Sequence, residues 1–564
     1  MIKNKNNIIF LMFVLIVFQF IFIRFYGDFH SLFMYNVKFY SFNLFQNDFY
    51  LQNSLSLKTS IIYPVLKILK INLSNDFIGF LIHLLFSTFN GFLIFKIIKN
   101  HFYVRGIENI FLIALVIISI DNFFIEANRG SWIISHSNSP TYFAKTLALL
   151  SVYLLLEKKI FFSILSLSFT LLVHIKVGWV LVPIFFLFLI TEKQIRIKTF
   201  YIILPLLCAL FLSSKEELVG SYEIRKNLFE IALDRDQIEG AFKFQSIYRN
   251  ISLFISFFIF YFLNKNETHL KKFNLVLLFI SASLFIFNIV YVEYIYEIIP
   301  DPRIIIIGIP RALELYETFF WLLLLKNVLK FEISNNLKVF FITGIFFLLI
   351  LTPKSLIICF LIFIFCFFLY FFKQLNIVKK FQEVDIFYIY FLSFFMIFLS
   401  QSYLSIKKIN KEIDFYTFSK TNKWTLPVLI NDKTFRLDSA LKIKKCDDFI
   451  LEDIDVSEKV TNYVANKSKF FGNVHYNYIN SKFINEHFKR NEIKNEILKN
   501  LNYKQNFEPQ LINKLESYEV VLLSTNTTAK FINHDNKIYL KNNDVLTIFD
   551  NKKFIEIKKC LKKT

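Results

Sequence analysis

Two residues near the amino terminus, Asp28 and His30, carry side chains that can take up a proton from a hydroxyl group. They belong to the segment Arg24 to His30, which directly follows the first hydrophobic run, Ile8–Ile23. If that run crosses a bilayer, both residues lie close to the membrane surface, on the side opposite the amino terminus. A carboxylate beside an imidazole at this place suits a general base. The alternative is a solvated loop, and partner residues from later loops on the same face favour the first interpretation.

A second group of polar residues lies in the stretch from 121 to 141. Glu126, Asn128 and Arg129 place a carboxylate, an amide and a guanidinium close together. These groups suit the binding of hydroxyl groups and of an anion. A surface ion pair between Glu126 and Arg129, which contributes little to stability, is an equally good explanation.

Cationic side chains farther along the chain suit a phosphate group. His174 and Lys176 lie in a short turn between two apolar runs, Arg303 follows a proline-rich turn, and Arg311 lies where a later apolar run begins. Arginine, lysine and histidine are the usual donors to phosphate oxygens. Simpler roles stay open, because a histidine at a helix end is often a cap and Arg311 could pair with Glu314 one helical turn away.

Membrane spans are the elements that must position these residues. The chain has 564 residues, of which 55% are hydrophobic, and a mean hydropathy of +0.48. This composition predicts a polytopic α-helical membrane protein with about thirteen transmembrane helices. No small-residue cleavage site follows the first run, so we expect it to remain as the first span. The predicted spans are Ile8–Ile23, Phe77–Phe95, Ile107–Phe124, Tyr142–Leu156, Ile160–Val173, Trp179–Ile190, Thr199–Leu212, Ile251–Leu263, Phe273–Tyr291, Ile304–Leu325, Val339–Leu351, Leu356–Phe372 and Ile386–Leu399.

The positions of the basic residues predict the orientation. The formal net charge is +21. Phe, Ile, Lys and Asn are abundant together, which is typical of a genome poor in G and C, so part of this charge reflects codon usage. We therefore expect no nucleic-acid partner. With the amino terminus in the cytoplasm, the cytoplasmic turns are the lysine-rich ones, as the positive-inside rule requires. They hold Lys96, Lys99, Arg105, Lys158, Lys159, Lys193, Arg196, Lys198, Lys265, Lys271, Lys272, Lys326, Lys330, Lys338, Lys373, Lys379 and Lys380.

In this orientation, the unusual polar residues named above lie at or near the outer face of the membrane. Their position on one side predicts a pocket that opens outward. In the first outer loop, Ser60–Ile71 has five apolar residues on one helical face: Ile61, Ile62, Val65, Leu66 and Leu69. This pattern predicts a helix along the membrane interface. A short helix that packs over the bundle is the alternative.

The composition changes after Leu399, where the long apolar runs end. We therefore divide the chain into a multi-span domain, residues 1–400, and a soluble extracytoplasmic α/β domain of about 160 residues, 401–564. Its two cysteines, Cys446 and Cys560, are predicted to form a disulfide, because an oxidising compartment favours the bond.

This predicted arrangement resembles the GT-C superfamily of membrane glycosyltransferases. The shared features are an amino terminus inside, many spans, an acidic residue (here Asp28) in a long first outer loop, and a carboxyl-terminal domain outside. The resemblance implies a lipid-phosphate-linked sugar donor and a role for Asp28 as base or metal partner. It implies that His30 assists Asp28, and that Glu126, Asn128, Arg129, His174, Lys176, Arg303 and Arg311 are candidates for substrate binding. The chain departs from the family in lacking its paired acidic motif, because the segment from Asp28 ends in His30, and in lacking a W-W-D-Y-G motif.

The resemblance predicts an inverting transferase at the outer face of a bacterial cytoplasmic membrane, in contact with membrane lipids. The sugar and the acceptor stay open, and a divalent metal ion is possible but not required. A cell-surface polysaccharide polymerase or ligase is the nearest alternative, and would be favoured if an arginine-rich outer loop rather than Asp28 were essential. A secondary transporter is another, although its charges would lie near the midplane within repeated halves.

Overall fold

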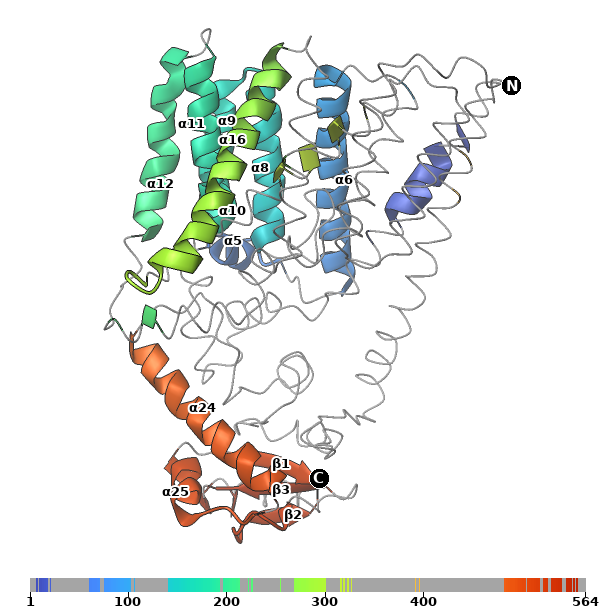
Figure 1. The fold of residues 1–564 in the computed structure, drawn as a ribbon. Helices are drawn as coiled ribbons and strands as arrows, with labels where there is room; N and C mark the ends of the chain where they lie inside the picture. Colours follow the sequence, from blue (N-terminus) through green and yellow to red (C-terminus); the bar gives the residue numbers. More distant parts are fainter. Residues whose placement is uncertain are drawn as a thin grey trace, which may run out of the picture.

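The structure is a computed structural model, and the part of the chain that it describes is mostly helical (Figure 1). The main described ranges are 10–18, 60–71, 76–102, 140–192, 196–213, 268–300, 481–503, 505–517, 521–525, 529–539 and 544–549, with single residues between them.

Two of the described helices are long and apolar enough to cross a membrane. They are α6 (Asp76–His101) and α16 (Thr268–Val290), whose apolar windows Ile78–His101 and Leu270–Phe287 have mean hydropathies of 1.9 and 1.8. A helix of this length spans about 30 Å, the thickness of the hydrocarbon core. Buried helices of soluble proteins can have the same length and composition.

Shorter apolar helices follow between these two in the sequence, where α8 contacts α6 and α11 contacts α16. They are α8 (Pro140–Leu156), α9 (Ile160–Val173), α10 (Ile175–Trp179), α11 (Leu181–Thr191), the 3₁₀ helix η1 (Arg196–Ile202) and α12 (Ile203–Ser213). Each predicted span that falls within the described ranges is helical.

Helices α8 and α9 form an antiparallel pair at the centre of the bundle. Small residues let them approach closely, because the Ser163 hydroxyl donates to the Ser151 carbonyl at 2.7 Å and Ser166 donates to the Leu147 carbonyl at 2.8 Å. Bonds of this kind between helices satisfy hydroxyl groups that have no access to water. Both helices therefore fit an environment in which polar groups must be paired within the protein.

One end of the bundle, which we call the basic end, collects charged helix termini. Glu157 directly follows α8, and its carboxylate accepts a hydrogen bond from the Asn100 side chain at 2.7 Å. The His101 imidazole lies 3.2 Å from the same carboxylate, and both Asn100 and His101 are at the end of α6. The buried Glu192, after α11, pairs with Lys272 near the start of α16 at 3.3 Å. These pairs place the turns after α6, α8 and α11 at the same end of the bundle.

The opposite end carries α5 (Ile62–Ile68), which lies across the ends of the upright helices in Figure 1. The expected helix in Ser60–Ile71 is present. Tyr63 and Leu66 are buried, whereas Val65 and Leu69 are exposed by 40% and 59%. Of the predicted apolar face, Leu66 is therefore buried, whereas Val65 and Leu69 are not.

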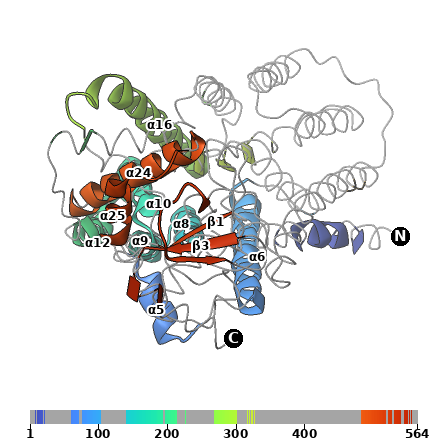
Figure 2. The same cartoon turned by 90° about the horizontal axis from the view of Figure 1, so that it is seen from below.

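The carboxyl-terminal part combines two helices with an antiparallel sheet. Helices α24 (Ser481–Asn502) and α25 (Pro509–Ser517) precede β1 (Val521–Thr525), β2 (Lys537–Tyr539) and β3 (Asp544–Ile548), in the sheet order β1-β3-β2. The register pairs Leu546 of β3 with Leu523 on one side and Ile538 on the other. Figures 1 and 2 place these elements beyond the end of the bundle that carries α5.

Candidate functional site

The turn between α9 and α10 is built around His174. Its backbone is extended, with φ −156° and ψ 103°, while its amide still donates to the Thr170 carbonyl at 2.9 Å. Its own carbonyl accepts hydrogen bonds from Val177 at 3.1 Å and Gly178 at 3.3 Å, which begin α10. His174 is thus the single residue at which the helix changes direction. His174 is the last cap residue of α9 and the first of α10, and its side chain makes no capping hydrogen bond to α10.

Lys176 follows in the first turn of α10 and is buried, with 4% of its surface exposed. Helix α10 contacts α8 as well as α9 and α11, so the lysine lies in the interior of the bundle. Burial of an ammonium group costs free energy. Such residues within membrane segments are rare and commonly mark a ligand site.

The first-loop helix α5 is attached directly to this turn. The Ser60 hydroxyl donates to the Val173 carbonyl at 2.6 Å, and the Ile61 amide donates to the Leu172 carbonyl at 3.1 Å. The last carbonyls of a helix have no partner within the helix, and the residues before α5 supply two donors to the end of α9. The contact joins segments 113 residues apart in the sequence, and it places Ser60 and Ile61 beside the turn at His174.

A polar face of α6 lies against α8. His83, Ser87 and Asn90 are buried, and their spacing of four and three residues places them on one side of the helix. The Ser87 hydroxyl shares a short hydrogen bond with the hydroxyl of Tyr142. The rings of Tyr142 and His83 lie 5.0 Å apart, and the Tyr142 hydroxyl also approaches the His83 carbonyl at 3.4 Å. These side chains form a buried polar layer between the two helices.

Lys145, one turn after Tyr142 on α8, is completely buried. Neither Lys145 nor the polar face of α6 was among the predicted site residues, which all lie in loops or at the ends of predicted spans. The signal that identifies the α6 face is present in the sequence, since three polar residues recur at helical spacing within an apolar span. Lys145 is a lone lysine within the span after Pro140.

Of the predicted site residues, the structure describes His174 and Lys176, and it brings both to the end of the bundle that carries α5. The other predicted site residues lie outside the described ranges. They are Asp28, His30, Glu126, Asn128, Arg129, Arg303, Arg311 and the cysteines Cys446 and Cys560. Within the described ranges, no group of three or more His, Cys, Asp or Glu side chains is arranged to bind a metal ion.

The described part of the site contains cationic side chains of the kind that suit an anion. Lys145 and Lys176 supply two buried ammonium groups on helices that contact each other, and His174 adds an imidazole at the adjoining turn. Electrostatic attraction is stronger in such a buried environment than in water. No protein-family model, curated protein or solved structure matches this chain.

Proposed function

We propose that this chain is a membrane glycosyltransferase of the GT-C type, which transfers a sugar from a lipid-phosphate donor to an acceptor at the outer face of a cytoplasmic membrane. The observation that supports it most directly is the burial of Lys145 and Lys176 within an apolar helical bundle. A phosphate attached to a lipid is an anion that reaches such a site laterally from the bilayer. A nucleotide-binding fold is then unnecessary.

The arrangement of the two bundle ends supports the proposed orientation. The basic end collects the turns with Lys158, Lys159 and Lys272, and lysine-rich turns face the cytoplasm in most membrane proteins. The end with α5, His174 and Lys176 is then the outer end. Attachment of Ser60 to α9 places the carboxyl-terminal end of the predicted first outer loop at the same end of the bundle as His174 and Lys176. Asp28 belongs to the same predicted loop but lies outside the described residues.

The proposed reaction is a direct displacement at the anomeric carbon. Asp28 accepts the proton of the acceptor hydroxyl, whose oxygen forms a bond to the anomeric carbon. The bond from that carbon to the phosphate oxygen breaks, and its electron pair leaves with the lipid phosphate. Lys145, Lys176 and His174 stabilise the negative charge that develops on this leaving group. One displacement inverts the configuration of the sugar.

A transfer assay in proteoliposomes tests the function. The purified protein is supplied with polyprenyl phosphates that carry different single sugars, together with extracts of cell-envelope acceptors. Lys145→Met and Lys176→Met should each lower transfer by about tenfold or more, since a charge-assisted hydrogen bond contributes ~1.5–3 kcal/mol. Lys70→Met is the control, because Lys70 is an exposed lysine near the same end of the bundle. Equal rates for all three variants would refute the role of the buried lysines.

A further inference from the structure

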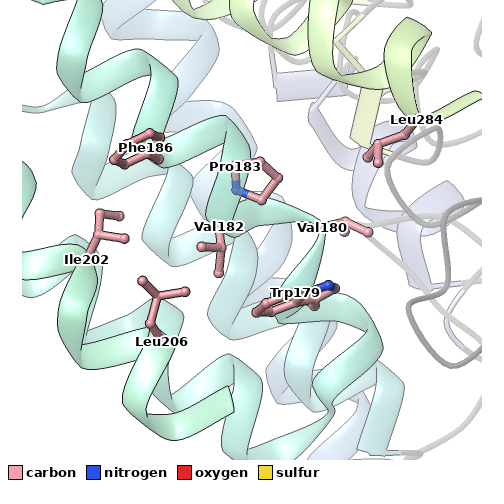
Figure 3. A pocket seen from close by; sticks show the side chains of 8 residues that line it. All are labelled: Trp179, Val180, Val182, Pro183, Phe186, Ile202, Leu206 and Leu284. Carbon is pink, nitrogen blue, oxygen red and sulfur yellow. The ribbon is translucent and has the colours of Figure 1, made fainter. Parts of the chain in front are cut away.

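An apolar groove lies beside α10, on the side where α11, α12 and α16 come together (Figure 3). Its volume is about 330 Å³, and no polar atom contributes to its surface. Its walls include Trp179 at the end of α10, Phe186 on α11, Leu206 on α12 and Leu284 on α16. A surface of this kind cannot orient a sugar or a nucleotide, because both need hydrogen-bond partners.

The groove continues into an exposed apolar surface. Phe186 and Leu206 in its walls are 43% and 38% exposed, and the neighbouring Ile203 and Leu207 of α12 are each 57% exposed. In a soluble protein such a patch marks an interaction site, and in a membrane it faces lipid. An occupant therefore enters sideways from the hydrocarbon core rather than from water.

We propose that this groove binds one acyl chain of a membrane phospholipid. A volume of about 330 Å³ holds roughly ten methylene-sized groups at ~30 Å³ each, if a methylene group takes about the volume of a water molecule. That is a segment of a single acyl chain, and phospholipid chains are the most abundant hydrocarbon around a membrane helix.

The headgroup of this lipid lies at the Trp179 end of the groove. Tryptophan is enriched at the level of lipid headgroups because its ring is apolar and its N–H is polar. The inference rests on the membrane placement in the proposed function, but it does not require transferase activity.

Photocrosslinking tests the groove in the full-length protein. Vesicles of phosphatidylethanolamine and phosphatidylglycerol, with a small fraction of phospholipid that carries a diazirine in the acyl chain, are irradiated after reconstitution. Peptides from α11 and α12 should be labelled more strongly than peptides from α9, whose Phe161 and Phe162 are also exposed. Equal labelling of these helices would overturn the proposal.

Filling the groove should remove the label. Leu206→Trp should lower labelling of α11 by about tenfold, which corresponds to ~1.4 kcal/mol of lost lipid affinity. Leu284→Trp fills the groove from the opposite wall and should have the same effect. Leu207→Trp is the matched control, because Leu207 is the next residue of α12 and does not line the groove.

Two results would contradict the assignment. One is unchanged labelling in both groove variants, and the other is loss of the label on addition of polyprenyl phosphate, which would assign the groove to the donor. Transfer activity is measured in parallel on the same samples. A wild-type protein that is labelled in the groove but inactive refutes the enzyme proposal alone, whereas an active protein without this label refutes the lipid site alone.

Discussion

The α-carbon of Gly178 packs against Leu171 so closely that a β-carbon at position 178 would lie 2.6 Å from the Leu171 Cγ and 2.9 Å from the Leu171 amide nitrogen. Real β-carbons do not make such contacts. Helix α10 can therefore fold back on α9 only if residue 178 has no side chain. This contact determines where His174 and Lys176 lie relative to the bundle.

Gly178→Ala should displace α10 and destabilise the protein, because overpacking of a tight contact costs ~1–3 kcal/mol. Gly91→Ala is the control, since no atom lies within 4 Å of a β-carbon at that position of α6. There the better helix propensity of alanine should leave stability unchanged or slightly higher. Apparent melting temperatures of the purified variants compare the two, and equal temperatures would mean that the α9–α10 contact is looser than described.

Ser60→Ala should loosen the attachment of α5. The substitution removes the hydrogen bond to the Val173 carbonyl and leaves a buried acceptor without this donor, at a cost of ~1–3 kcal/mol. Limited trypsin digestion should then cut faster after Lys67, which lies on α5. Thr88→Ala, which removes a bond within α6 only, should leave the digestion rate unchanged. Equal rates for the two variants would show that α5 is held by its apolar contacts alone.

Asp28→Asn tests the proposed base, because it preserves the size of the side chain and removes its ability to accept the proton. Transfer from the lipid-linked donor should be lost, while the amount of folded, membrane-inserted protein stays that of the wild type. Turnover near the wild-type rate would move the catalytic site elsewhere and leave Asp28 as an ordinary loop residue.

The helices of the bundle were largely predictable from the sequence, whereas their contacts were not. The expected span Ile160–Val173 has the same bounds as α9, because a long apolar run bounded by Lys159 and His174 leaves few alternatives. The close approach of Gly178 to Leu171 depends on the direction of α10, which no local pattern specifies. Lys145 was missed for a related reason, since an isolated lysine in an apolar run gives no sign of whether it points inward.

Cys446 and Cys560 should form a disulfide if the carboxyl-terminal domain is extracytoplasmic, because reducing conditions in the cytoplasm would keep both thiols free. Closing so long a loop would stabilise the domain by ~3–5 kcal/mol in the chain-entropy model. Mass mapping of the non-reduced protein should find the two peptides linked. Two thiols that are alkylated without a reductant would contradict both the bond and the orientation.

We propose that a lipid phosphate binds at the end of the bundle where Lys145 and Lys176 are buried. A radiolabelled polyprenyl phosphate with a photoreactive group beside the phosphate tests it directly in the reconstituted full-length protein. The label should map to the segment from α8 to α10, and it should fall in Lys145→Met and Lys176→Met but not in Lys70→Met. Labelling spread evenly over the exposed helices, or unchanged in both buried-lysine variants, would contradict the proposed site.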